Sequence, residues 1–158
     1  MTRTFKQGLH RVGLSDHQRA IASTDRAVSQ VVLEKYGDQL CCTCTGGQQF
    51  DCGHFRRREC MPTRFHPFNL SKQCQRCNRF EGGRSYEFSQ WIDWTFGIGT
   101  AVFLEQLSRT IEPWTTEELG TLKDAARRGW QVYEATYFML RPHHHPDVAG
   151  LRKTATAA

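Results

Sequence analysis

The sequence predicts a small α+β fold that is mostly helical, and two observations lead to this expectation. Between residues 41 and 78 the chain contains two Cys-x-x-Cys pairs, and residues 48–55 between them are predicted to form a short strand. On both sides of this stretch, apolar residues recur at the three- and four-residue intervals of amphipathic helices. We therefore expect a cysteine-bracketed element surrounded by helices.

A chain of 158 residues is long enough for one domain, or for one domain with helical extensions. We divide it into an N-terminal arm and helix (1–40), the cysteine-bracketed core (41–84), a helical part (85–141) and a flexible tail (142–158). The net charge of +5 and the pI of about 8.9 favour a polyanionic partner without proving one. No stretch approaches the ~20 apolar residues of a membrane span. The N-terminus lacks a signal-peptide core, so we expect a cytoplasmic protein.

The first helical segment is predicted between residues 15 and 36. Ser15 with Gln18 forms a capping box, and Asp25 can cap a second start, so one or two helices are expected. Gly37 is a natural stop. Residues 1–14 carry several basic side chains and are either a flexible arm that touches DNA or an ordinary frayed terminus.

The two cysteine pairs have the spacing of a structural zinc site. Cys41 with Cys44 and Cys74 with Cys77 can place four thiolates around one tetrahedral ion. Seven cysteines could instead form a secreted disulfide framework, but the number is odd and a reducing compartment favours thiolate ligands. Cys42 could replace Cys41 only through a cramped Cys-x-Cys chelate. The remaining cysteines, Cys52 and Cys60, are predicted not to be ligands.

After the second pair, residues 69–79 are expected to turn into a helix, and three more helices follow. Ser85 can cap a helix whose apolar face includes Tyr86. Thr100 can cap the next, and Thr115 with Glu118 forms a further capping box.

The last of these helices is predicted to be long and amphipathic, ending near Leu140. Gly129 should weaken it by about 1 kcal/mol relative to alanine. Aromatic residues along these helices are assigned to the core. The histidines His143 to His145 are placed in a solvated tail.

The loop between the cysteine pairs contains the residues that point to chemistry. Hydrolysis of a phosphodiester needs a group that takes a proton from water and a cation that stabilises the developing negative charge. Histidine suits the first role because its unperturbed pKa is about 6.5. His54 lies on the predicted strand, with Asp51 before it and Asn69 and Asn78 after it. This arrangement favours a catalytic over a structural histidine.

The order of these residues resembles the HNH, or ββα-metal, nucleases in an H-N-N variant. More narrowly, several motifs resemble the NinG (Rap) recombination endonucleases of lambdoid phages. These motifs are Asp51-Cys52-Gly53-His54-Phe55-Arg56, Arg64-Phe65, Asn69, Lys72-Gln73-Cys74, Cys77-Asn78 and Trp114-Thr115 with Glu117-Glu118. The resemblance covers about residues 41–140 and implies that residues 41–84 form a zinc-held ββα-metal nuclease core.

The resemblance also implies a role for each residue. His54 is the expected general base, Asn78 a ligand of a catalytic Mg²⁺ or Mn²⁺, and Asn69 the residue that fixes the loop carrying His54. Many relatives have the metal-binding acid directly before the histidine, where this chain has Gly53. Asp51 could share the metal only across about 10 Å of strand, which needs a bulge at Gly53.

Basic residues gather around the cysteine bracket and predict a phosphate-contacting face that binds DNA without sequence choice. They are Arg56, Arg57, Arg58, Arg64, Lys72, Arg76, Arg79 and Arg84. His66 is interpreted as an exposed loop histidine, with a ligand or phosphate contact as the alternative.

We therefore expect a metal-dependent DNA endonuclease of the HNH type with structural zinc. The resemblance alone predicts branched DNA, such as Holliday junctions or D-loops, as its substrate and phage recombination as its role, which would place it in the host cytoplasm. Symmetric junction cleavage would favour a homodimer. Two alternatives stay open: an HNH nicking or restriction-type nuclease on ordinary duplex, and a zinc-stabilised DNA-binding module without catalysis.

Overall fold

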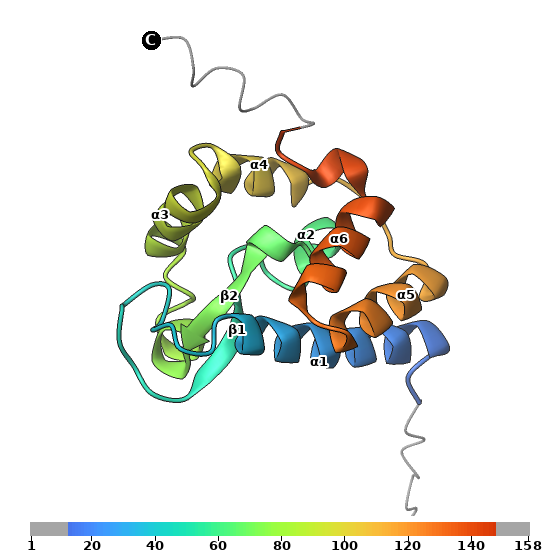
Figure 1. The fold of residues 1–158 in the computed structure, drawn as a ribbon, viewed down its shortest axis with the longest axis horizontal. Helices are drawn as coiled ribbons and strands as arrows, with labels where there is room; N and C mark the ends of the chain where they lie inside the picture. Colours follow the sequence, from blue (N-terminus) through green and yellow to red (C-terminus); the bar gives the residue numbers. More distant parts are fainter. Residues whose placement is uncertain (1–12, 148–158) are drawn as a thin grey trace, which may run out of the picture.

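The computed structural model describes residues 13–147, which form a mostly helical molecule with one two-stranded sheet (Figure 1). Its elements are α1 (Asp16–Lys35), β1 (Phe50–His54), α2 (Met61–Arg64), η1 (Pro67–Asn69), β2 (Leu70–Cys74), η2 (Arg76–Phe80), α3 (Ser85–Phe96), α4 (Thr100–Leu107), α5 (Thr116–Arg127), α6 (Trp130–Leu140) and η3 (Pro142–His144). The predicted predominance of helix is confirmed. Within the described range, no helix combines the length and apolarity that crossing a membrane requires. The predicted N-terminal arm falls almost wholly outside this range.

Helix α1 is the longest element and is continuous. The capping box of Ser15 and Gln18 is present as predicted. The second start at Asp25 is wrong, because its carboxylate accepts two hydrogen bonds from the guanidinium of Arg64 instead of capping a helix. The Asp25–Arg64 pair joins α1 to α2. A residue with a capping side chain is thus used for a tertiary ion pair.

The hairpin of β1 and β2 is antiparallel, and its register runs from Phe50 opposite Cys74 to His54 opposite Leu70 without interruption. The bulge expected at Gly53 is therefore absent. A Cβ at Gly53 would lie 2.8 Å from the Cβ of Gln73, so the glycine makes room for that buried side chain. Strand β2 occupies the first half of the segment that was expected to turn into a helix, and the helical part is the short π-helix η2, which contains Cys77.

The predicted long C-terminal helix is two helices, α5 and α6, with Gly129 between them. Gly129 has φ 114° and ψ 168°, a conformation that only glycine adopts readily, so it ends the helical path instead of merely weakening it. The capping box of Thr115 and Glu118 starts α5 as predicted. Ser85 and Thr100 are the first residues of α3 and α4, whereas the capping positions are Arg84 and Gly99.

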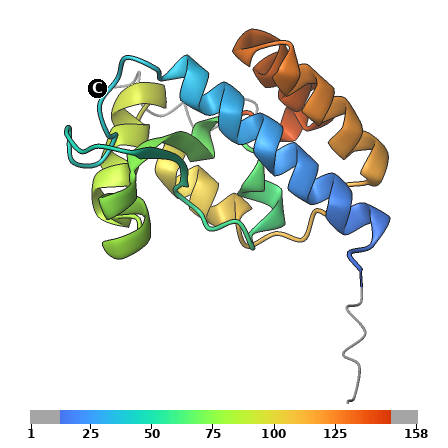
Figure 2. The same ribbon diagram turned by 90° about the horizontal axis from the view of Figure 1, so that it is seen from below.

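The core consists of two aromatic-rich clusters on either side of the hairpin. In Figure 1, α1 runs below the hairpin, and the view from below in Figure 2 shows α5 and α6 on one side of α1 and α3 and α4 on the other. The larger cluster contains Val28, Val31, Val32, Tyr36, Cys52, Phe65, Leu70, Trp114, Leu119, Leu122, Ala126, Tyr133 and Tyr137. The smaller one contains Phe68, Phe88, Ile92, Ala101, Phe103, Leu104 and Leu107. The aromatic stripes are mostly core, as predicted, but Tyr86 is 71% exposed.

The start of the predicted tail is part of the folded molecule. His144 is fully buried, with Nδ1 2.7 Å from the hydroxyl of Tyr137, so a solvated tail from residue 142 is wrong for this histidine. His66 is also fully buried and not an exposed loop residue. Its Nδ1 accepts a hydrogen bond from the Phe68 amide, and its Nε2 lies 3.0 Å from the carbonyl oxygen of His144.

Candidate active site and metal centre

The four predicted zinc ligands come together at one end of the hairpin. The sulfur atoms of Cys41, Cys44, Cys74 and Cys77 all lie within 4.8 Å of one another. The Cys44 and Cys74 sulfurs are 3.8 Å apart, which equals the edge of about 3.8 Å that a tetrahedron with Zn–S bonds of about 2.3 Å requires. The cluster includes Cys41 and not Cys42, as predicted. The donor set therefore fits a closed structural zinc site.

The backbone around the cluster is built to hold thiolates close together. Burial raises the pKa of the Cys41 thiol, but hydrogen bonds from the Thr43 hydroxyl and from backbone amides outweigh it and bring the pKa to about 6. Gly47 has φ 88°, and a Cβ there would lie 2.4 Å from the Cβ of Cys74 and 2.7 Å from its sulfur. This position therefore accepts only glycine.

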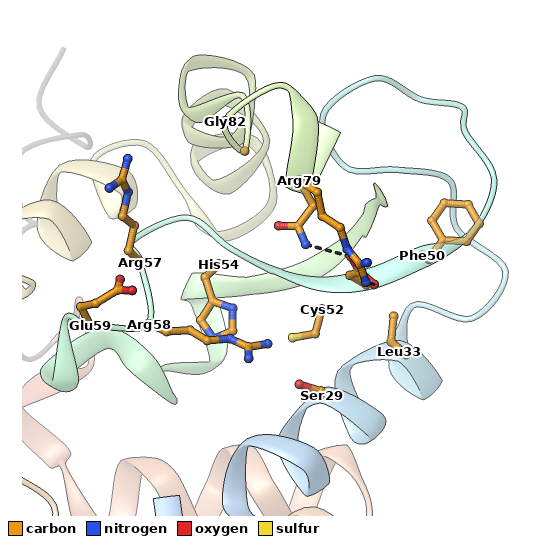
Figure 3. Close-up of a pocket in the computed structure, with 13 residues that line it drawn as sticks. Ser29, Leu33, Phe50, Cys52, His54, Arg57, Arg58, Glu59, Arg79 and Gly82 are labelled. Carbon is orange, nitrogen blue, oxygen red and sulfur yellow. Dashed lines mark hydrogen bonds and ion pairs between the residues drawn. The ribbon is translucent and has the colours of Figure 1, made fainter. Parts of the chain in front are cut away.

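Beside the cysteine cluster, an open cavity of about 720 Å³ gathers most of the predicted catalytic residues (Figure 3). Asp51 and His54 of β1 and Asn78 of η2 line it, together with Arg57, Arg58, Glu59 and Arg79. Ser29 and Leu33 of α1 also line it, and no local motif in the sequence marks them as part of a site. Within residues 13–147, β1 pairs only with β2, and its residues Phe50, Asp51, Cys52 and His54 line this cavity.

His54 lies at the end of β1 on the same strand face as Cys52, which points toward Ser29 of α1 (Figure 3). Burial and the positive charge of Arg58 lower the pKa of His54 to about 4, although a hydrogen bond to the backbone of Cys52 acts in the opposite direction. The imidazole is therefore neutral near neutral pH. Since that bond favours protonation, its acceptor is the Cys52 carbonyl, which leaves the second ring nitrogen able to take a proton.

Asp51 and Asn78 meet at the same cavity. The Asn78 amide donates to Asp51 Oδ2 at 3.1 Å, and Arg79 donates to both carboxylate oxygens at 2.7 and 2.8 Å. The hydrogen bonds and charge of Arg79 lower the pKa of Asp51. The carboxylate and amide oxygens are suitable ligands for a hard divalent cation. A cation bound to Asp51 requires its ion pair with Arg79 to open, a competition that the sequence did not reveal.

Asn69 ties together the two ends of the connection between β1 and β2 through hydrogen bonds. Its Oδ1 accepts from the Arg56 amide at 2.7 Å, and its Nδ2 donates to the carbonyls of Arg56 and Thr63 at 3.0 and 2.9 Å. Its own carbonyl accepts from the Phe55 amide at 2.9 Å. Asn69 is fully buried, so it fixes the chain directly after His54 without facing the cavity.

The predicted phosphate-contacting residues divide into two groups. Arg57 and Arg58 are exposed and line the cavity. Arg64 is mostly buried in its pair with Asp25, and Lys72 is 9% exposed with its ammonium group 2.6 Å from the Gly37 carbonyl oxygen. Arg64 and Lys72 therefore stabilise the fold and are removed from the DNA-contacting set.

The other members of the set are engaged with acidic side chains or with the protein. Arg76 pairs with Glu81, and Arg84 pairs with Glu81 and Glu87. Arg56 donates to the Ser108 hydroxyl at 3.2 Å. These side chains border the site, but each would have to leave an existing contact to bind a phosphate. Arg57 and Arg58 are therefore the side chains best placed to contact one.

A family model described as bacteriophage lambda NinG protein matches residues 4–134 of the chain, which is most of its length. The chain belongs to the NinG family. No curated protein and no solved structure matches it. The resemblance to NinG seen in the motifs is thereby confirmed, and family membership suggests a role in phage recombination.

The NinG match includes the four cysteines, the hairpin and every residue that lines the cavity. It ends inside α6, so Tyr137, His143 and His144 lie beyond it. The candidate active site therefore lies inside the matched range, and η3 lies outside it.

Proposed function

We propose that this NinG-family protein is a metal-dependent DNA endonuclease of the HNH type that cleaves branched intermediates of phage recombination, such as Holliday junctions and D-loops. The observation that carries the proposal is the joint lining of one cavity by His54, Asp51 and Asn78. Asp51 and His54 lie on β1 and Asn78 lies in η2, the turn that follows β2, beside a four-cysteine cluster, and this order is the one expected of an HNH nuclease.

His54 is suited to the role of general base. Because its pKa is lowered to about 4, the imidazole is neutral at the pH of a cell and can accept a proton from the attacking water. The Cys52 carbonyl orients the ring, and Asn69 holds the chain that follows it. The four thiolates would hold zinc as a structural ion with no open position, so it supplies folding energy and not activated water.

Asn78 and Asp51 would hold a hard cation, Mg²⁺ or Mn²⁺, through their side-chain oxygens. Because β1 pairs with β2 without a bulge at Gly53, Asp51 lies about 10 Å along the strand from His54, so His54 is not a ligand of that cation. A bound divalent cation supplies stabilisation of the negative charge that develops on the phosphate. Asp51 would hold the cation only with its pair to Arg79 open, which would leave the Arg79 guanidinium free in the cavity. That guanidinium can then pair with a phosphate oxygen, as can Arg57 and Arg58. Preference for branched DNA rests on the family alone.

A cleavage assay on linear, forked and four-way DNAs of matched sequence, with Mg²⁺ or Mn²⁺, tests the proposal. The parent should cut the branched DNAs in preference to the linear one. His54→Ala should lose about 10²–10⁴-fold in rate, the usual loss for a general base, while it keeps its zinc and its DNA affinity. His17→Ala, a histidine on α1 outside the cavity, should cut like the parent.

The remaining outcomes separate the alternatives. Equal cutting of linear and four-way DNA would keep the nuclease and discard the recombination substrate. Binding of DNA without cleavage under any cation would leave only the DNA-binding module. If His54→Ala cuts at the parent's rate, the active site assigned to this cavity is wrong.

A further inference from the structure

A second group of potential metal ligands lies far from the cysteines along the chain, where the loop before α5 meets η3. Glu112 comes from that loop, and His143 and His144 come from η3. The Nε2 atoms of both histidines are 2.9 Å from the same Oε2 atom of Glu112. The three ligand atoms all lie within 4.8 Å of one another.

Two imidazoles and one carboxylate are a ligand set for a divalent transition metal such as Zn²⁺ or Co²⁺. Bonds of about 2.0–2.1 Å in a tetrahedral site place ligand atoms about 3.4 Å apart. The present 2.9 Å contacts are hydrogen bonds of the ion-free group. An outward movement of about half an ångström would therefore admit an ion.

The environment of His144 resembles that of a metal-bound histidine. The side chain is fully buried, and its Nδ1 is 2.7 Å from the Tyr137 hydroxyl, which lies 3.3 Å from the Pro62 carbonyl oxygen. If Nδ1–H donates to Tyr137 and Tyr137 donates to Pro62, the lone pair of Nε2 faces the carboxylate of Glu112. A cation between Nε2 and the carboxylate satisfies both, and such a hydrogen bond on the second nitrogen is usual for metal-bound histidines.

The group is also accessible from one side. The His143 side chain is 59% exposed and that of Glu112 is 28% exposed, so an ion can enter past His143 while His144 stays in place. The group shares no residue with the cysteine cluster or with the cavity of Asp51, His54 and Asn78.

We propose that Glu112, His143 and His144 form a second binding site for a divalent transition-metal ion, which fastens the end of α6 and η3 to the loop before α5. With three protein ligands and an open position, this site holds its ion less tightly than the four-cysteine site. The ion therefore exchanges while the cysteine-bound metal stays.

The test is zinc titration of the full chain after a brief wash with a mild chelator, followed by native mass spectrometry. The parent should retain one ion and take up a second, and the second ion should raise its melting temperature because it binds only the folded state. His143→Ala and Glu112→Gln should retain the first ion and lose the second. Tyr137→Phe should weaken uptake of the second ion about 10–100-fold, as loss of an outer-shell partner typically does.

The matched control is His145→Ala, which removes the neighbouring histidine that is not in the ligand group. It should bind the second ion like the parent. The proposal is overturned if the parent takes up no second ion. It is also overturned if His145→Ala loses the ion as fully as His143→Ala, since that indicates adventitious binding by a histidine-rich segment, or if none of the variants loses it.

Discussion

At the scale of single residues, the geometry of the cysteine cluster depends on Gly47, a residue that is not itself a metal ligand. Gly47 lies directly against Cys74, and its positive φ adds backbone strain for any other residue. Gly46, its neighbour, has only the Cys44 carbonyl oxygen at 3.9 Å from its potential Cβ. An alanine side chain would therefore collide with Cys74 at position 47 but would fit without a clash at position 46.

Gly47→Ala is expected to displace Cys74 and to lower zinc content and the melting temperature together, because structural zinc contributes folding energy. Gly46→Ala should retain zinc at the parent's level. Elemental analysis of the purified variants with thermal melts checks this pair. Full zinc in Gly47→Ala would show that the loop can move aside without loss of the site.

His66 predicts how stability depends on pH. Burial lowers its pKa to about 3 from an ordinary value of 6.5, and both ring nitrogens already have partners in the neutral form. The unfolded chain therefore binds a proton below pH 6.5 that the folded chain does not bind. The stabilisation is complete above pH 6.5 and is lost as pH falls toward 3, at about 1.4 kcal/mol per pH unit.

Urea unfolding of chelated protein between pH 6.5 and 4 measures this dependence. His66→Gln, whose amide can still donate and accept, should show a shallower decline in the free energy of unfolding than the parent. Identical slopes in parent and variant would mean that His66 does not contribute to acid sensitivity.

At the scale of elements, the separation of α5 from α6 is decided by one glycine. Gly129 has φ 114°, whereas Gly120 lies inside α5 with open space around its potential Cβ. Gly129→Ala should reduce the free energy of unfolding by about 1–3 kcal/mol through backbone strain. Gly120→Ala should increase it by about 0.5–1 kcal/mol through better helix propensity. Chemical denaturation of both variants tests the opposite signs, and stabilisation by Gly129→Ala would support the continuous helix predicted from the sequence.

Elements whose signals are local were predictable from the sequence. The capping boxes at Ser15 and Thr115 and the Cys-x-x-Cys spacings act over three or four residues, and each appears in the structure. Strand β2 was less visible, because its three central residues, Ser71, Lys72 and Gln73, are polar although all five side chains are buried. Its sequence therefore shows neither an alternation of polar and apolar residues nor the apolar run typical of a strand buried on both faces.

Features that depend on distant partners could not be predicted in the same way. Asp25 accepts hydrogen bonds from Arg64, 39 residues away, and His144 contacts the carboxylate of Glu112, 32 residues away. No pattern within a helix or loop marks these pairs. For the candidate site, the sequence indicated His54, Asn69 and Asn78 but not the ion pair of Asp51 with Arg79 or the walls contributed by α1.

At the scale of the whole molecule, the phosphate-contacting face predicted around the cysteine bracket is smaller than the sequence implied. With Arg64 and Lys72 held internally, the predicted arginines that line the cavity are Arg57, Arg58 and Arg79, and Arg79 becomes available once its pair with Asp51 opens. A polyanion should therefore meet the protein mainly on the face of the cavity.

Arg57→Gln with Arg58→Gln is expected to weaken binding to every DNA tested and to reduce the salt dependence by about one ion per arginine removed. Arg127→Gln, an exposed arginine of α5 outside the cavity, should leave the salt slope unchanged. Affinity measured across a range of salt concentrations for each variant provides the test. If Arg127→Gln lost as much DNA affinity and salt dependence as the double variant, the cavity would not be the main DNA-binding face.

The connection between β1 and β2 is held from the far end of the chain: Tyr133 donates to the Phe65 carbonyl, Tyr137 to that of Pro62, and Trp114 to that of Met61. During translation, His54 and Asn78 are made before all three of these aromatic residues. A nascent chain that stops before α6 lacks both tyrosines and with them two of the three anchors of this connection. The connection that follows His54 therefore has its full set of anchors only once α6 has been synthesised.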